Sequence, residues 1–335
     1  MSSTVSEAPA RPRAASRGFA VSLARTERLS RTFLRLTFTG DDLDGIGTKT
    51  LDQRIKLVLP AACDTPVDLD LFADAAWYAT WLALPDGERP VMRTYTVRAV
   101  RPEVKEVDVD VVLHGVEPGA GRTSACPVAE DHACVFAGDV GPAVRWSSTA
   151  RTGDPLVIIG PDGRYPEQAG IEWHPPAEAR TFLVAGDETA VPAISSIVAA
   201  LPAGARGHVF CEVPTSDDFL PLDAPPGVEV TWIARGAKGV EAQHGELLDL
   251  AVRAAAPRLL HGGVGREEFE DVDLDAGILW DVPAQPSAPD GVYAWIAGEA
   301  TAIKELRRFL VRDLGMDRKA VAFMGYWRAG RSEGS

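Results

Sequence analysis

The sequence predicts two domains, an N-terminal antiparallel β-barrel and a C-terminal α/β domain with a Rossmann-like parallel sheet. Length is the first reason, since 335 residues exceed a typical single hydrophobic core and fit two domains of roughly 100–200 residues each. The second reason is a change of pattern at the proline pair Pro175 and Pro176. Before this pair, short β-branched runs alternate with turn signals, and after it strands alternate with helices.

The first half contains short runs with the composition of β-strands and no helical period between them. Valine alternates with aspartate over residues 107–111, which is typical of a strand with one buried face. The predicted strands are 32–39, 55–59, 95–100, 107–113 and 155–159. Strands at this spacing predict a small antiparallel barrel. We expect 61–88, which contains Trp77, Tyr78 and Trp81, to form a long loop over it, with the tryptophans used for packing.

The second half alternates strands with helices, which indicates a parallel sheet. The predicted strands are 181–185, 208–213, 228–233 and 292–296, and the predicted helices are 190–201, 245–254 and 301–314. Two strand–turn–helix junctions inside this half repeat one another. Residues 185–191 (A-G-D-E-T-A-V) align without gaps on 297–303 (A-G-E-A-T-A-I).

Each junction places a glycine at the end of a strand, an acid beside it and a threonine at the start of a helix. Ligands bind at this edge of an open α/β sheet, where helix N-termini offer amides to phosphate or hydroxyl groups. The repeat therefore predicts the floor of a nucleotide cleft, with Thr189 and Thr301 both facing it. The alternative is that glycine only permits the turn and the polar residues only cap the helices. Neither junction contains the G-x-G-x-x-G dinucleotide motif.

A β-prone run at 90–98 (P-V-M-R-T-Y-T-V-R) is the best candidate for cofactor binding. Side chains at i and i+2 of a strand share a face, so Arg93 and Tyr95 can contact one ligand. A guanidinium pairs with phosphate, and an adjacent phenol ring can lie flat on a heterocycle. This pairing suits a flavin dinucleotide. The alternative is an ordinary strand with an exposed arginine.

Charge and cysteine spacing exclude several classes of protein. With 34 basic and 48 acidic residues the net charge is −14, which argues against nucleic acid and anionic membrane surfaces as partners. The four cysteines, Cys63, Cys126, Cys134 and Cys211, lack metal or iron–sulfur spacing, which favours a metal-free cytoplasmic protein. We expect 1–18 to be a disordered tail, since it lacks the apolar core of a signal peptide. No run approaches the ~18 apolar residues of a membrane span.

These features resemble the siderophore-interacting protein family, flavin-dependent reductases of ferric siderophores within the ferredoxin-reductase superfamily. The resemblance covers about residues 21–330 and rests on the stretches 90–98, 111–115, 141–146, 153–163, 186–194, 295–299 and 325–328. It implies an FAD-binding barrel over 19–173 and an NAD(P)H-binding domain over 177–335. The R-x-Y-[ST] signature of the superfamily falls on Arg93, Tyr95 and Thr96. It implies that Arg93 holds pyrophosphate, Tyr95 stacks on the isoalloxazine and Thr96 lies near flavin N5.

The resemblance implies further cofactor and substrate residues. His114 would lie against the flavin, and a short helix beginning at Gly141 would present amides to the FAD pyrophosphate. The remaining cofactor candidates are Ala143, Trp146, Asp187, Thr189, Ala190, Thr301, Tyr326 and Trp327. Arg235 and Lys238 are candidates for the 2′-phosphate or an acidic substrate, and Arg328 is a further candidate for binding the anionic substrate. The chain departs from the family pattern at 116–140, an insertion that falls at the flavin edge.

The expected function is NAD(P)H-dependent reduction of ferric siderophores, with release of Fe(II). FAD would carry the chemistry, so no protein metal ligand or nucleophile is required. One alternative is a general flavin reductase or a reductase that serves a separate iron–sulfur protein. A second alternative is a module that binds ferric siderophore without turnover. The sequence leaves NADH and NADPH open.

Overall fold

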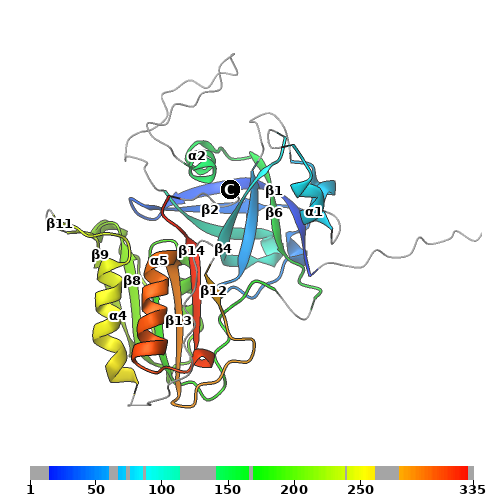
Figure 1. Ribbon diagram of the computed structural model, residues 1–335. Coiled ribbons are helices and arrows are strands. Elements are labelled where there is room, and N and C mark those ends of the chain that lie inside the picture. The colour runs from blue at the N-terminus through cyan, green and yellow to red at the C-terminus, as the bar shows by residue number, and fades with distance from the viewer. Residues whose placement is uncertain are drawn as a thin grey trace, which may run out of the picture.

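The computed structural model describes residues 15–59, 67–72, 76–85, 88–113, 141–165, 169–237, 240–260 and 279–330. The candidates His114 and Lys238, and the insertion 116–140, lie outside the described residues. The described chain forms a barrel and an α/β sheet, one stacked on the other (Figure 1). This is the predicted two-domain architecture. No helix in the described ranges has the length and apolar character needed to cross a bilayer.

Six antiparallel strands close the barrel in the order β1-β2-β5-β4-β3-β6. Their bounds are β1 Ser16–Arg28, β2 Phe33–Thr39, β3 Arg54–Leu59, β4 Val91–Arg101, β5 Glu106–Val112 and β6 Pro155–Pro161. All five predicted strands are present. The sixth, β1, overlaps the predicted tail because residues 16–18 already pair with β6. Phe19, Val21 and Leu23 of β1 are all buried. The first three residues of the strand, Ser16 to Gly18, are polar or small, so the sequence pattern places them in the tail.

Short helices cover the barrel. They are η1 Leu43–Gly45, η2 Leu69–Phe72, α1 Trp77–Leu82, η3 Pro102–Val104 and α2 Pro142–Thr149. The segment predicted as a long loop therefore contains η2 and α1. The ring of Trp77 lies 5.7 Å from Phe72, and the Trp81 indole donates a hydrogen bond to the Pro90 carbonyl at 2.9 Å. These aromatic side chains pack against the protein.

The second domain is a six-stranded sheet in the order β12-β14-β13-β7-β8-β9, and its neighbours are parallel except at the edge strand β12. The strands are β7 Thr181–Gly186, β8 Arg206–Val213, β9 Gly227–Ala234, β12 Trp280–Asp281, β13 Val292–Glu299 and β14 Val321–Trp327. A separate hairpin pairs β10 Gly236–Ala237 with β11 Val240–Glu241. The helices are α3 Val191–Ala200, η4 Ser216–Asp218, α4 Glu246–Leu259, α5 Ala300–Arg307, the π-helical turn η5 Arg308–Asp313 and η6 Arg318–Ala320.

The strand order places a topological switch point between β7 and β13. From β7 the chain continues outward through β8 and β9, and the later strands β13 and β14 lie on the opposite side of β7. Side chains of α3 pack on one face of the sheet, and those of α4 and α5 pack on the other. The sheet is therefore doubly wound, and ligands of such sheets bind at the carboxyl end of the switch point. That end points toward the barrel (Figure 1).

One of the apolar clusters contains residues of both domains. Phe33 and Val112 of the barrel belong to the same buried cluster as α3 and the α3-facing side of the sheet. Helix α3 also contacts β4. Ile171 and Trp173, between the two sheets, lie in this cluster as well. The linker therefore packs with the second domain, and the boundary we propose near residue 175 crosses a continuous core.

Candidate functional site

Strand β4 presents Arg93 and Tyr95 on one face. The β3–β4 register places Leu57 opposite Arg93 and Ile55 opposite Tyr95. Directly opposed residues of an antiparallel pair share a face, so Arg93 and Tyr95 lie on the side of the core residues Leu57 and Ile55. Thr96 is buried and lies on the opposite face of β4.

Helix α2 begins in the barrel domain after Gly141. It packs against β3 and β5, the two neighbours of β4 in the barrel. Trp146 of α2 stacks on Phe38 with ring centroids 6.2 Å apart, and Ala143 is buried. No side chain caps the first turn. A Cβ at Gly141 would meet no described atom within 4 Å. Among the described residues, no side chain occupies the first amides of α2, which are therefore suited to bind an anion.

Arg93 differs from the other arginines of its strand in its partners. Its Nη1 donates to the Met92 carbonyl at 2.8 Å, and no described carboxylate pairs with it. Arg98 lies 3.8 Å from Asp110, and Arg101 bonds Asp108 at 2.6 Å. A half-buried guanidinium without a carboxylate partner among the described residues fits a pyrophosphate, and the first amides of α2 are a second candidate set of donors. The described residues thus fit FAD.

Asp187 joins the ends of three strands at the switch point. Its carboxylate accepts hydrogen bonds from the Thr189 amide at 2.9 Å, the Glu299 amide at 2.8 Å and the Trp327 indole at 2.8 Å. The Thr189 hydroxyl donates a further short bond. Gly298 has φ +153, and a Cβ there would lie 2.7 Å from the Asp187 carboxylate. Glycine is therefore required at this turn for the carboxylate to approach.

Burial controls the protonation of Asp187. The side chain is 1% exposed, and burial, with the charge of Glu188 as a second cause, raises its pKa to about 7. The bonds from Thr189 and Trp327 act in the opposite direction and favour the carboxylate. The switch point therefore contains a group that exchanges a proton near neutral pH.

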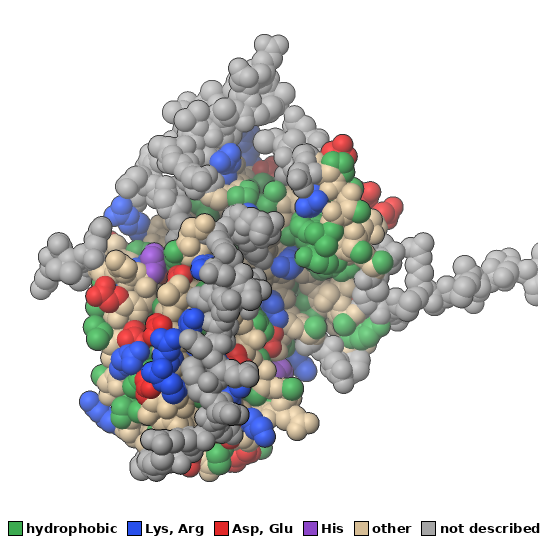
Figure 2. Space-filling view, in the orientation of Figure 1, with side chains coloured by type: hydrophobic (Ala, Val, Ile, Leu, Met, Phe, Trp, Pro, Cys, Tyr) green, Lys and Arg blue, Asp and Glu red, His purple; other side chains and the backbone are tan. Residues whose placement is uncertain are grey.

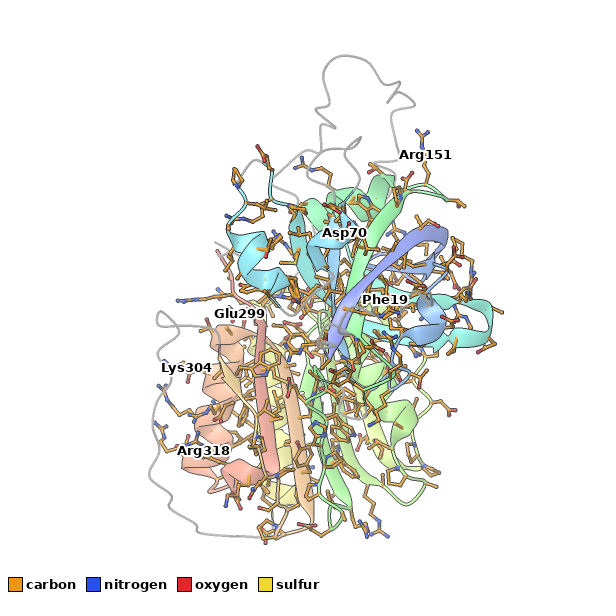
Figure 3. All side chains as sticks on the ribbon, turned by 90° about the vertical axis from the view of Figure 1, so that its right-hand side faces the viewer. Phe19, Asp70, Arg151, Glu299, Lys304 and Arg318 are labelled. Atoms are coloured by element: carbon orange, nitrogen blue, oxygen red, sulfur yellow. The ribbon has the colours of Figure 1, made fainter. Side chains whose placement is uncertain are left out.

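The second junction repeats the geometry of the first. Glu299 caps α5 by accepting from the amides of Thr301 at 2.7 Å and Ala302 at 3.1 Å, and the Thr301 hydroxyl donates to it at 3.3 Å. In both junctions the threonine bonds the acid two residues before it. Figure 3 shows Glu299 at the end of the sheet nearest the barrel. Thr189 is half-buried and Thr301 is exposed at this edge.

Ala190 has a packing contact in this structure. It is completely buried, and a Cβ built on Gly186 would lie 2.5 Å from the Ala190 Cβ. The pair thus allows α3 to start close against β7, and the Ala190 side chain has no exposed surface.

Arg235, a candidate for substrate or a 2′-phosphate, is buried and paired with acids of its own domain. Arg235 is 8% exposed, and its Nη1 and Nη2 donate to the two carboxylate oxygens of Glu188 at 2.7 and 2.8 Å. Glu212 lies 3.4 Å away and also accepts from the Gly245 amide at 2.7 Å. Two buried carboxylates require a cation, and Arg235 supplies it.

Sequence reasoning missed Glu188, Glu212 and His244. The His244 ring meets the Trp327 ring edge-on with centroids 4.9 Å apart, and its Nδ1 lies 3.9 Å from Glu188. Burial, followed by the charge of Arg235, lowers the His244 pKa. Glu212 is a charged residue near the end of an apolar strand segment, V-F-C-E-V. That pattern is the signal that could have identified part of this cluster.

Tyr326 and Trp327 lie in different surroundings. Tyr326 packs between Trp280 and Trp295 with ring centroids 6.0 and 6.2 Å away, and burial raises its pKa. Trp327 is held at the switch point by Asp187. Arg328 follows it and is half-buried. Among the C-terminal candidates, Trp327 therefore makes the contact with Asp187 at the switch point, and Arg328 is its neighbour in the sequence.

Two family models match nearly the whole chain. The siderophore-interacting FAD-binding domain matches residues 22–165, and the siderophore-interacting protein model matches residues 179–330. An uncharacterised protein of Mycobacterium bovis is 33% identical over 304 residues, which are 90% of this chain and 79% of the relative.

A named relative and a solved structure extend this similarity. The ferric vibriobactin reductase ViuB of Vibrio cholerae is 26% identical over 310 residues, with 92% of this chain and 89% of ViuB covered. A siderophore utilization protein from T. fusca superposes with a TM-score of 0.62 at 26% identity, and 95% of each chain is covered.

Proposed function

The chain belongs to the siderophore-interacting protein family, and we propose that it is an FAD-dependent oxidoreductase that transfers electrons from NADH or NADPH to ferric siderophores. One observation carries the proposal. Helix α3, which begins at the first threonine junction, contacts β4, the strand that carries Arg93 and Tyr95. The second junction lies beside the first, because the Glu299 amide donates to Asp187. A flavin site and a nucleotide cleft so placed suit electron transfer between two bound molecules.

We assign the FAD site to residues of the barrel. Arg93 and the first amides of α2 would hold the pyrophosphate, and Tyr95 would lie against the ring system. Thr96, the residue that the family signature puts near flavin N5, lies on the opposite face of β4 and is buried. Bound FAD supplies the conversion between a two-electron donor and a one-electron ferric acceptor. The chain itself then needs only to bind, orient and shield.

We assign the nicotinamide nucleotide to the switch point. Thr189 and Thr301 offer hydroxyls at the carboxyl edge of the sheet, and their carboxylate partners fix the rotamers. Trp327 would form one wall, because Asp187 orients its indole. A fixed wall keeps donor and acceptor in contact and excludes water.

Capture of an anionic ferric complex requires local positive charge, because the net charge is −14. Figure 2 shows Lys and Arg side chains gathered over α4 and α5. At least two arginines of this region have acidic partners, since Arg253 of α4 pairs with Asp249 and Arg308, directly after α5, pairs with Glu305. With Arg235 committed to Glu188, the remaining candidates from the sequence are Arg328 and Lys238.

Anaerobic mixing tests the proposal directly. Protein is reduced with NADH or NADPH, ferric siderophores of the hydroxamate, catecholate and carboxylate classes are added with a ferrous trap, and flavin reoxidation is followed by absorbance. We expect reoxidation faster than in buffer for at least one class. Normal flavin reduction without siderophore-dependent reoxidation would favour a general flavin reductase or a separate electron-transfer partner. An absorbance spectrum without bound flavin would favour the binding module.

A further inference from the structure

We propose that Asp52 and Asp218 are positioning residues that clasp the two domains together from opposite sides and thereby hold the flavin and nicotinamide sites in register. Asp52 comes from the barrel and reaches the second domain, and Asp218 comes from the second domain and reaches the barrel. The consequence for mechanism rests on the proposed function. The clasp itself rests on contacts that are independent of it.

The first contact ties the flavin strands to β13. Asp52 is 1% exposed and accepts from the Trp295 indole at 2.9 Å and from the Trp173 amide at 3.1 Å. It lies two residues before Arg54, the partner of Thr96 in the β3–β4 register. Trp295 lies in the middle of β13, four residues before the acid of the second junction. A single carboxylate thus links the segment before β3 to the strand that ends at the second junction.

The second contact runs in the opposite direction. Asp218 in η4 is completely buried. One of its oxygens accepts from the Ser30 hydroxyl at 2.7 Å and the Thr32 amide at 2.9 Å, both in the turn between β1 and β2. The other oxygen accepts from the amide and hydroxyl of Thr215 at 3.2 and 3.0 Å, within its own domain. Each half of this carboxylate therefore serves one domain.

Two separate points of attachment fix orientation as well as contact. One contact would leave the domains free to rotate about it, whereas two separate contacts allow rotation only about the line that joins them. Separation of the domains would leave buried donors and carboxylates without partners, and each such loss is costly. The shared apolar core around Phe33 acts in the same sense. We therefore infer that the nicotinamide binds at the switch point without separation of the domains.

The test removes the donors across the boundary and keeps both carboxylates. Trp295→Phe deletes the indole N–H on Asp52, and Ser30→Ala deletes one hydroxyl on Asp218. Thr215→Val is the matched control, because it deletes a hydroxyl on the same Asp218 carboxylate from inside its own domain. Flavin reduction by saturating NADH or NADPH requires both domains. Reoxidation of photoreduced flavin by ferricyanide requires only the barrel.

We expect the Ser30→Ala/Trp295→Phe double variant to reduce its flavin at least tenfold more slowly, with ferricyanide reoxidation and FAD content within twofold of wild type. A misplacement on the order of 1 Å costs this much or more. Thr215→Val should stay within twofold in both reactions. Reduction of the double variant at the wild-type rate, or equal slowing of both reactions, would overturn the positioning role.

Hydrogen exchange gives a readout without turnover. If the two contacts act as one unit, Trp295→Phe alone should speed hydrogen exchange of the Thr32 amide, at the other contact, by about tenfold. The control Thr215→Val should leave the exchange rate of the Trp173 amide unchanged. Faster exchange confined to Trp173 would show two independent local bonds and refute the clasp. If neither nicotinamide reduces the wild-type flavin, the proposed function fails, and this exchange result still decides whether the clasp exists.

Discussion

Arginine side chains in this molecule differ by the partners that surround them. Arg235 is buried against Glu188 and Glu212, so it stabilises the end of β8 and the start of α4. Arg93 is half-buried and pairs with no carboxylate among the described residues. The first has its counter-ions in the protein, and the second is free to bind an anionic group of a cofactor.

Arg93→Ala should weaken FAD binding. Loss of a charge-assisted partner costs roughly 1.5–3 kcal/mol, which corresponds to about a 10- to 150-fold rise in the dissociation constant. Titration of apoprotein with FAD, followed by flavin fluorescence, measures it. Arg98→Ala is the control, since that guanidinium on the same strand lies 3.8 Å from Asp110. Equal affinity in wild type and Arg93→Ala would remove Arg93 from the site.

Asp187 should make stability fall as pH rises from about 4 towards 7. Its pKa of about 7 in the fold exceeds the ordinary 3.8, so the folded state retains a proton that the unfolded state releases. The stabilisation is complete below about pH 4 and is lost as pH approaches 7. The linked free energy is on the order of 4 kcal/mol.

Urea unfolding of wild type and Asp187→Asn between pH 4.5 and 8 measures this effect. The asparagine does not titrate, so the difference between the two proteins isolates Asp187 from acids such as Asp162, whose pKa is lowered by Arg164. The unfolding free energy of wild type should fall relative to the variant as pH rises. A constant difference across the range would show that Asp187 stays ionised.

At the scale of the element, the two strand–turn–helix junctions have the same local hydrogen-bond pattern. An acid follows the glycine, and the threonine two residues later donates its amide and hydroxyl to that acid. The same local sequence serves two different tertiary tasks. Asp187 ties three strand ends together, whereas Glu299 caps α5.

Gly141→Ala should separate cofactor binding from folding. No described atom lies within 4 Å of the added Cβ, and φ −56 suits alanine, so the melting temperature of the apoprotein should change little. The Cβ would occupy space at the N-terminus of α2, where we place the pyrophosphate. FAD affinity should therefore fall by about tenfold, an effect of roughly 1.4 kcal/mol. Unchanged affinity would move the pyrophosphate away from α2.

At the scale of the whole molecule, the barrel and the α/β sheet are joined by a common core and by two buried carboxylates. The apolar cluster includes residues of β2, β5 and α3. Such a junction differs from a flexible domain linker, where relative motion is the default expectation. The two proposed sites are consequently parts of one folded unit.

Phe33→Ala should transmit a barrel defect into the second domain. Truncation of a buried phenylalanine costs about 3–5 kcal/mol, and Phe33 lies in the shared cluster. We expect faster hydrogen exchange in α3 and β7 as well as in β2. Phe72→Ala is the matched control. Phe72 is also buried, but the described members of its cluster all belong to the barrel domain. Faster exchange confined to the barrel in both variants would contradict a shared core.

The sequence by itself determined the two kinds of domain, the strands of the barrel other than β1, and the two junctions. These features are written in short-range patterns, because alternation, helical period and turn residues act within a few positions. The face shared by Arg93 and Tyr95 follows from strand geometry in the same way. These patterns do not predict the π-helical turn η5, which follows α5.

Only the tertiary structure decided which polar groups meet. Arg235 pairs with an acid 47 residues away, Asp218 bonds Ser30 across 188 residues and Asp52 bonds Trp295 across 243 residues. Residues this far apart in the chain become neighbours only when the barrel closes and the domains dock. Local sequence patterns do not specify such partners, so the sequence identified Arg235 as a cation and the fold assigned its role.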